Sequence, residues 1–168
     1  TAAASTSNLI IDNKQNVADS GTQFQMGIFR QAANAEGFCA TLRKVLTQFE
    51  EHSGLPVTLD FECPTDRFCA SGALPPVAAV QIIRIIQEAL TNIRKHAQAS
   101  QAWIRVYFEI DKIVIYIEDN GVGFDPVQRM EEQHYGLQIM KERAESVGGN
   151  VRYQSQPGSG TCVIIEAP

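Results

Sequence analysis

The chain has 168 residues, which suffices for one domain with a substantial core and disfavours two full domains. Hydrophobic residues make up 44% of it and charged residues 20%, a composition typical of a globular protein and not of a disordered or fibrous one. The net charge of −5 arises from 19 acidic and 14 basic residues without a run of Lys or Arg, which argues against a nucleic-acid-binding surface. No apolar run approaches the roughly 20 residues that span a bilayer, so we expect no membrane contact by this chain.

The four cysteines show no metal-binding pattern. Cys39, Cys63, Cys69 and Cys162 lack C-x-x-C spacing, and no histidine lies at zinc-ligand distance from them in the sequence. Free thiols in a reducing compartment are therefore expected. A disulfide between Cys63 and Cys69 is the weaker alternative.

The first 35 residues show no sustained apolar period, and the chain begins with Thr1 rather than Met. We interpret residues 1–35 as an appendage or the remnant of an upstream element, and residues 36–168 as the domain. Within the domain, apolar residues recur at helical spacing from Phe38 to Phe49 and then alternate with polar ones from Val57 to Phe61. A helix followed by a half-buried strand is predicted.

A long central helix is predicted from Pro75 to about His96, because proline is tolerated in a first turn and apolar residues follow at steps of three and four. The apolar stripe comprises Ala79, Ile82, Ile83, Ile86, Leu90 and Ile93. A second stripe is polar and shares one helix face, and it comprises Gln81, Arg84, Glu88, Asn92 and Lys95.

Two hairpins and a third helix complete the predicted fold. Alternating strands from Trp103 to Ile110 and from Ile113 to Asp119 are joined by a tight turn. A helix from Tyr135 to Val147 follows, and a second hairpin spans Asn150 to Glu166. These elements predict an α/β two-layer sandwich, in which a mixed, mostly antiparallel sheet carries its helices on one face.

The polar stripe of the central helix contains residues suited to a metal and a phosphate. Glu88 and Asn92 are four apart and point the same way. A carboxylate with an amide oxygen suits Mg²⁺ that keeps waters and binds phosphate oxygens, and Lys95 one turn later adds positive charge. The alternative is an ordinary solvated helix face, and these residues alone favour it.

Three further stretches combine glycine with a polar group. Asp119 to Phe124 places an acid and two glycines directly after an apolar strand, which suits either close approach to a ligand or a simple turn. Gly136 and Leu137 open the third helix, where unpaired N–H groups favour an anion. The stretch Gly158 to Thr161 is either a hairpin turn or a ligand edge.

The histidines carry weaker signals. His96 either caps the central helix or contacts a ligand, and His134 fastens the loop before it or contacts a ligand. No Ser-His-Asp or Cys-His order is evident, so hydrolase chemistry of that kind is not supported.

Taken in order, four stretches resemble the motifs of one family. Gln87 to His96 resembles the N box of sensor histidine kinases, and Asp119 to Phe124 resembles their first glycine box. His134 to Ala144 resembles the second glycine box, and Gly158 to Thr161 the last. The family is the ATP-binding catalytic domain shared by histidine kinases, gyrase-type ATPases and Hsp90 chaperones, whose Bergerat fold matches the predicted sandwich. The N box and the short loop before His134 resemble the nitrate/nitrite sensor subfamily.

The resemblance implies a role for each matching position. Asp119 would accept from the adenine amino group, supported by Thr161 and Gly123, and Asn92 would ligate Mg²⁺. Residues 125–133 would form the lid over the nucleotide. Residues implied in phosphoryl transfer are Glu88, Lys95 and His96. Residues implied in ATP binding are Asn92, Asp119, Gly121, Gly123, His134, Tyr135, Gly136, Leu137, Gly160 and Thr161.

The function implied is that of a two-component sensor histidine kinase catalytic domain, which binds Mg-ATP and phosphorylates a histidine. Residues 1–35 contain no histidine, so the acceptor is expected on a missing upstream dimerisation domain, with a response regulator as the indirect partner. The resemblance implies a cytoplasmic location for this chain, and it is compatible with a full-length parent protein that is anchored in the membrane. The alternatives are a stand-alone anti-sigma-type protein-serine kinase and a non-catalytic nucleotide-binding module.

Overall fold

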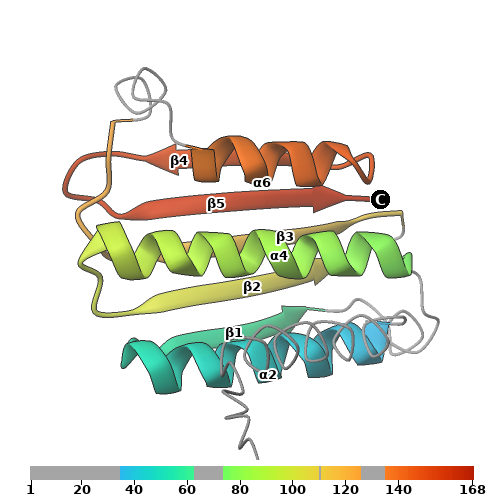
Figure 1. Ribbon diagram of the computed structural model, residues 1–168, viewed down its shortest axis with the longest axis horizontal. Coiled ribbons are helices and arrows are strands. Elements are labelled where there is room, and N and C mark those ends of the chain that lie inside the picture. The colour runs from blue at the N-terminus through green and yellow to red at the C-terminus, as the bar shows by residue number, and fades with distance from the viewer. Residues whose placement is uncertain (1–34, 63–73, 110, 126–134) are drawn as a thin grey trace, which may run out of the picture.

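The computed structural model describes residues 35–62, 74–109, 111–125 and 135–168. Within these ranges, helices cover one face of a five-stranded sheet, with the long α4 across its middle (Figure 1). In chain order the elements are α2 (Ala35–Ser53), β1 (Val57–Glu62), α4 (Pro76–Asn92), the π-helical turn η1 (Ile93–Ala97), β2 (Ala102–Phe108), β3 (Ile113–Asp119), α6 (Tyr135–Glu145), β4 (Asn150–Ser155) and β5 (Thr161–Ala167).

The sheet is mixed, in the order β1-β2-β3-β5-β4. β1 and β2 pair in parallel, and the other neighbours pair antiparallel. A parallel pair needs a long crossover, which here runs through α4 between the two strands. The predicted fold class, a two-layer sandwich with a mostly antiparallel sheet and helices on one face, is confirmed.

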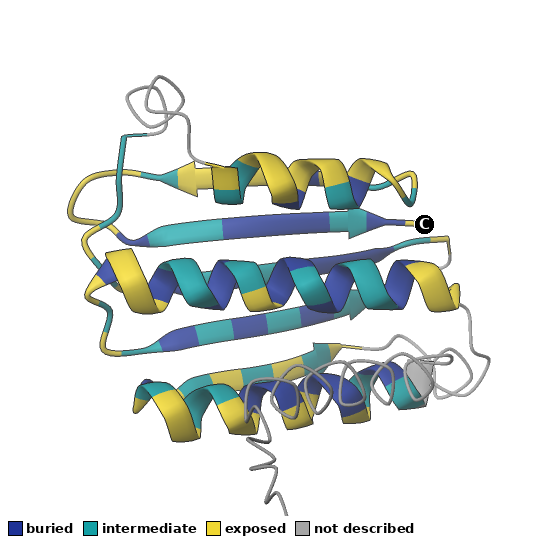
Figure 2. Ribbon diagram, in the orientation of Figure 1, coloured by how far each residue is buried: buried dark blue, intermediate teal, exposed yellow. Residues whose placement is uncertain are grey.

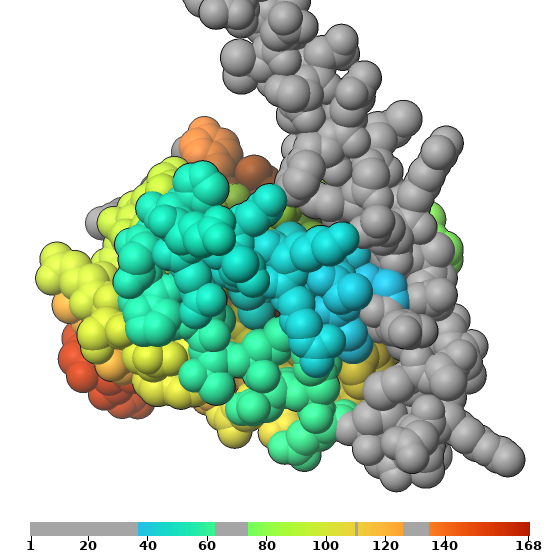
Figure 3. All heavy atoms as spheres, turned by 90° about the horizontal axis from the view of Figure 1, so that it is seen from below, coloured from blue at the N-terminus to red at the C-terminus, as the bar shows by residue number. Residues whose placement is uncertain are grey.

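The core lies between the helices and the sheet. Inward residues of β2 alternate strictly with less buried ones, as Figure 2 shows along the strand. The predicted stripe of α4 is buried, with Ile82 and Ile86 fully enclosed. At one edge of the sheet, α2 lies beside β1 and the two share that surface of the molecule (Figure 3).

The face of the sheet opposite the helices is polar and aromatic. Arg105 pairs with Glu118 across β2 and β3, and the rings of Tyr107 and Tyr116 meet edge to face. Cross-strand pairs of this kind stabilise this face, which none of the described helices covers. Tyr116 therefore lies on the side of the sheet away from the helices.

Some element boundaries differ from the sequence predictions. The central helix continues to Ala97 as expected, but its last five residues form a π-helical turn that apolar spacing does not reveal. The third helix ends at Glu145 instead of Val147, because Gly148 takes a positive φ in the turn that follows. Cys39 and Cys162 are not disulfide-bonded, and Cys63 and Cys69 lie outside the described residues.

Several predictions concern residues outside the described ranges. These are nearly all of the appendage over residues 1–35, the Cys63–Cys69 disulfide alternative, nearly all of the lid over residues 125–133, and His134. They remain predictions. Across the described part of the chain, no helix combines the length and apolarity required to cross a membrane.

The central helix offers a matched test of the core. Ile86 is fully buried in α4, whereas Val77 in its first turn is 65% exposed. We expect Ile86→Ala to lower the free energy of unfolding by about 2–5 kcal/mol, because it leaves a cavity under the helix. Val77→Ala serves as the control and should change it little. Urea denaturation monitored by circular dichroism measures both, and equal effects would contradict this core.

Candidate functional site

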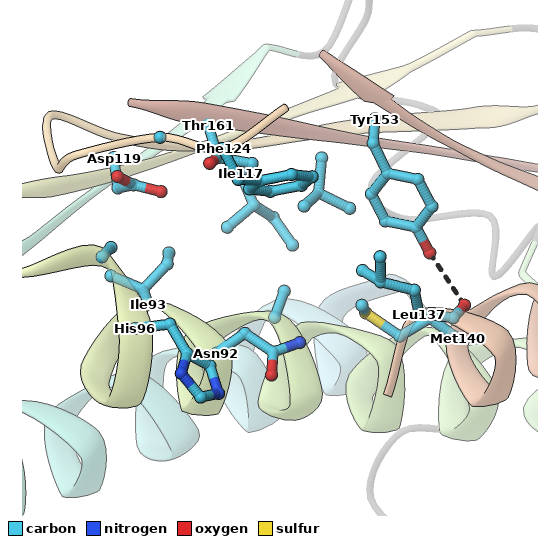
Figure 4. Close-up of a pocket in the computed structure, with 14 residues that line it drawn as sticks. Asn92, Ile93, His96, Ile117, Asp119, Phe124, Leu137, Met140, Tyr153 and Thr161 are labelled. Carbon is cyan, nitrogen blue, oxygen red and sulfur yellow. Dashed lines mark hydrogen bonds between the residues drawn. The ribbon is translucent and has the colours of Figure 1, made fainter. Parts of the chain in front are cut away.

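A pocket lies between the C-terminal part of α4 and the sheet, with the start of α6 at one end (Figure 4). Its lining residues come from α4, η1, β3, the loop after β3, α6, β4 and β5. They are Ala89, Asn92, Ile93, His96, Ala97, Ile117, Asp119, Gly123, Phe124, Leu137, Met140, Tyr153, Thr161 and Val163. The pocket is largely apolar, with a few polar groups at defined points, as small-molecule sites generally are.

Two cross-strand rows of the sheet form one wall. One row holds Asp119 opposite Thr161, and Ser155 follows on the outer strand. The next row holds Ile117, Val163 and Tyr153 in the same order. Because alternate residues of paired strands share a face, these side chains all point toward the helices. The three strands β3, β5 and β4 therefore fix the wall as one unit.

Asp119 is the buried acid of the pocket, at the end of β3 with only 6% of its surface exposed. Its Oδ1 accepts a 2.7 Å hydrogen bond from the Gly121 N–H. Burial raises the pKa of Asp119, and backbone hydrogen bonds from Gly121 and Thr161 partly offset that shift. A carboxylate held in this way suits a ligand that brings an N–H donor into an apolar slot.

The loop after Asp119 is tied to the end of the helical run. The Asn120 Oδ1 accepts from the backbone N–H groups of Ser100 and Gln101 at 2.9 and 3.0 Å. The Val122 N–H donates to the Ala97 carbonyl at 2.7 Å. Asn120 therefore holds the turn in place and does not face the pocket. The π-helical turn ending at Ala97 is joined to the loop by these bonds.

A second set of bonds ties the same loop to the terminal hairpin through Ser155. The Ser155 Oγ accepts from the Phe124 N–H at 2.9 Å and donates to the Gly160 carbonyl at 2.9 Å. It also lies 3.0 Å from the Thr161 hydroxyl. Ser155 was not predicted from the sequence. The sequence did contain a signal for it. Ser155 places a hydroxyl on the inward face of an alternating strand, close to the Gly158 to Thr161 stretch.

Two glycines allow the backbone to close around Asp119. Gly123 has φ +62°, and a Cβ there would lie 2.1 Å from the Gln156 carbonyl oxygen. Gly160 has φ +73°, and a Cβ there would lie 2.0 Å from the Asp119 carbonyl oxygen. No other residue fits either contact without moving the backbone. The loop and the hairpin therefore approach more closely than side chains would allow.

The helix side of the pocket carries an amide and an imidazole. Asn92 is half-buried and His96 is exposed, and both lie along the wall opposite Asp119 in Figure 4. Glu88 lies outside the lining but next to the start of α6, since a Cβ on Gly136 would lie 2.6 Å from its Oε1. Lys95 is exposed and does not line the pocket.

The first turn of α6 forms the other end of the pocket. Leu137 lines it, and the Tyr153 hydroxyl donates to the Leu137 carbonyl at 3.0 Å. Tyr135 points away, with 76% of its surface exposed. Of the remaining predicted site residues, Gly121 and Gly160 support the walls without lining the pocket, and His134 lies outside the described residues. Tyr153 and Phe124 line the pocket without having been predicted.

The donor set decides which metal fits. Among the described residues, no group of three or more His, Cys, Asp or Glu side chains could hold a metal. Asn92 offers a single amide oxygen, which suits an ion that keeps waters and takes its other ligands from a bound phosphate. Within the described ranges, the side chains therefore offer no full ligand set for zinc or a transition metal.

Comparison with a protein-family model supports a nucleotide site. Residues 78–168, about half of the chain, match the model of the histidine kinase-, DNA gyrase B- and HSP90-like ATPase family. This match includes all four stretches whose order resembles the kinase motifs.

Curated relatives are sensor kinases. The chain is 35% identical over 139 residues to the signal transduction histidine-protein kinase/phosphatase DegS of Brevibacillus brevis, covering 83% of this chain and 34% of DegS. It is 32% identical over 165 residues to the nitrate/nitrite sensor protein NarQ of Escherichia coli, covering 96% of this chain and 28% of NarQ. The chain thus spans about a third of the length of these relatives.

Solved structures share the fold. A histidine kinase domain from the blue-light activated histidine kinase of Erythrobacter litoralis superposes with a TM-score of 0.60 at 20% identity, covering 78% of this chain and 60% of that one. The histidine kinase AdeS of Acinetobacter baumannii gives a TM-score of 0.58 at 14% identity, covering 92% and 80%.

Gly123 and Gly158 form a matched pair for testing the close approach. Both have positive φ, but a Cβ at Gly158 meets nothing within 4 Å. Gly158→Ala should cost about 1–2 kcal/mol of stability for its left-handed backbone. Gly123→Ala should cost more, because two carbonyl oxygens oppose the new methyl group. Chemical denaturation compares the two, and equal losses would contradict the close approach.

The buried acid predicts a pH-dependent stability difference. Burial raises the pKa of Asp119 in the folded state. Protonated Asp119 therefore contributes stability below its unfolded-state pKa of about 3.9. This contribution is lost as pH rises through the folded-state pKa. Asp119→Asn removes the charge and keeps the shape, so the ligand-free variant should gain stability over the wild type from acid to neutral pH.

Thermal unfolding at a series of pH values measures this difference. Asp111→Asn, at an exposed position in the turn after β2, is the control and should show no such trend. A variant less stable than the wild type at neutral pH would mean that the hydrogen bonds from Gly121 and Thr161 outweigh burial.

Proposed function

Because the chain belongs to the histidine kinase-, DNA gyrase B- and HSP90-like ATPase family, as an ATP-binding catalytic domain of the sensor histidine kinase type, we propose that its pocket holds Mg-ATP for transfer of the γ-phosphoryl group to a histidine. Asp119 carries the proposal: it is a buried acid at the end of an apolar slot, held by backbone N–H groups. The named relatives are sensor kinases, which favours this function over an anti-sigma-type serine kinase.

The adenine ring would lie in the apolar slot with its exocyclic amino group toward Asp119. Ile93 and Ile117 supply apolar surface on the two walls, and Gly123 lets the ring approach the backbone. Thr161 would support the same end. Guanine presents a carbonyl where adenine presents an amino group, so a carboxylate at this position favours adenine.

The phosphates would extend toward Asn92 and the first turn of α6. Asn92 would ligate Mg²⁺, and the ion would supply charge neutralisation to the phosphate oxygens when bound. Backbone N–H groups of Gly136 and Leu137 would face the phosphates, because a helix N-terminus favours an anion. Lys95 and His96 would face the phosphates at the same end.

Glu88 would act on the attacking imidazole. It lies on the same helix face as Asn92 and beside Gly136, close to where the proposed phosphate end begins. A carboxylate there would orient the incoming histidine by accepting its N–H. Gly121, Gly160, His134 and Tyr135 remain assigned to nucleotide binding, the first two through the loop and hairpin that enclose Asp119.

The parent protein would supply the remaining parts. Since the chain spans about a third of its relatives, the acceptor histidine is assigned to a dimerisation domain outside it, and the phosphoryl group would pass onward to a response regulator. The chain itself is assigned to the cytoplasm. The alternative product, phosphoserine, differs from phosphohistidine in surviving acid.

Calorimetric titration of the 168-residue chain with Mg-ATP tests the proposal. We expect binding by the wild type and at least a tenfold weaker affinity for Asp119→Asn, because a charge-assisted hydrogen bond to the adenine amino group contributes about 1.5–3 kcal/mol. Asp111→Asn is the control and should bind like the wild type. No binding by the wild type would refute the function, whereas equal binding by Asp119→Asn would refute only the adenine anchor.

A further inference from the structure

Tyr153 makes a bond across the pocket that the family motifs do not include. It lies on the outer strand β4, between Val151 and Ser155 on the face toward the helices. Its ring lines the pocket, and its hydroxyl donates to the Leu137 carbonyl at 3.0 Å (Figure 4). The bond therefore joins the outer edge of the sheet to the first turn of α6.

The hydroxyl is not needed to complete the helix. A carbonyl at this point of an α-helix ordinarily accepts from the N–H four residues later, so Tyr153 is an additional donor to Leu137. An apolar side chain would fill the same volume in the wall. Burial raises the pKa of Tyr153 to about 12, so the phenol remains a hydrogen-bond donor throughout the neutral range.

The first turn of α6 is less buried than its later turns, and its Leu137 is only partly buried against the core. The fully buried residues of this helix, Met140 and Ala144, lie in its later turns. In the first two turns Tyr135 is 76% exposed and Ile139 is 40% exposed. A directional bond has more influence on the position of such a segment than on one already fixed by close packing.

We propose that Tyr153 is a positioning residue for the phosphate end of the pocket, acting through the Leu137 carbonyl on the first turn of α6. This inference rests on the proposed function of the same pocket. Tyr153 shares a cross-strand row with Ile117, two residues before Asp119. The bond thus sets the N–H groups of Gly136 and Leu137 at a fixed place relative to the strand that carries the adenine anchor.

The proposal separates two parts of nucleotide recognition. Adenosine binding would depend on Asp119 and the apolar slot. The Asp119 carboxylate is held by the Gly121 N–H, whereas the Tyr153 hydroxyl bonds to Leu137 of α6. ADP and Mg-ATP also depend on the α6 turn. Loss of the hydroxyl should therefore weaken phosphate-bearing ligands and leave adenosine unchanged.

Tyr153→Phe in the 168-residue chain is the test, because it removes the hydroxyl and keeps the ring. We expect affinity for ADP and Mg-ATP to fall about three- to tenfold, the range of one neutral hydrogen bond, with adenosine affinity unchanged, all measured by calorimetry. Tyr116→Phe, on the opposite face of the sheet, is the matched control and should change none of them. Amide hydrogen exchange in the first turn of α6 should be faster in ligand-free Tyr153→Phe than in the wild type.

Equal losses for adenosine and ADP would overturn the proposal, since they would indicate a general change in the pocket. Unchanged ADP affinity together with unchanged hydrogen exchange would overturn it as well. If the wild-type chain bound neither adenosine nor ADP, the proposed function itself would fail, and the role of Tyr153 with it. A loss confined to the phosphate-bearing ligands supports it.

Discussion

A carboxylate buried at the end of a strand is the constraint on which the pocket depends. An ionised acid out of water is unfavourable unless hydrogen bonds compensate, and Asp119 receives them from the backbone of the adjoining loop and of β5. The net pKa is still raised, so the compensation is incomplete. A ligand N–H that donates to this carboxylate would supply the hydrogen bond that the fold does not provide. Such incomplete compensation is expected of a ligand-binding group and not of a structural ion pair.

The loop that follows Asp119 is held from two directions. Asn120 and Val122 tie it to the end of the central helical run, and Phe124 ties it to Ser155 on the outer strand. Gly123 lies between these attachments, where the backbone approaches the terminal hairpin. The loop is therefore a fixed wall, and its rigidity follows from contacts between segments far apart in the sequence. Such preorganisation reduces the ordering needed when a ligand binds.

The fold was largely predictable because it depends on local periods. Alternation in β2 and β3 and the three-four spacing in α4 fixed their buried faces, and the hairpins required antiparallel pairing. The π-helical turn at Ile93–Ala97 and the bonds of Ser155 and Tyr153 were not predictable. Each depends on which remote backbone group a side chain meets, and residue spacing along one element holds no information on that. Motif order assigned Asp119, Asn92, Glu88 and Lys95 to one site. In the structure the first two line the pocket and the last two do not.

The two ends of the pocket differ in how they are built, and this bears on how the site would work. The Asp119 end belongs to paired strands and a doubly attached loop, whereas the other end belongs to the first turn of a helix in which Leu137 is partly buried and full burial begins at Met140. Local stability follows buried contacts, so the α6 turn should open more readily than the sheet. A base would then be recognised by the sheet and its attached loop, and its phosphates by a helix turn that the Tyr153 hydrogen bond to Leu137 holds in position. In phosphoryl transfer the acceptor must reach the terminal phosphate, so opening confined to the α6 turn would admit the acceptor without loosening the hold on the base.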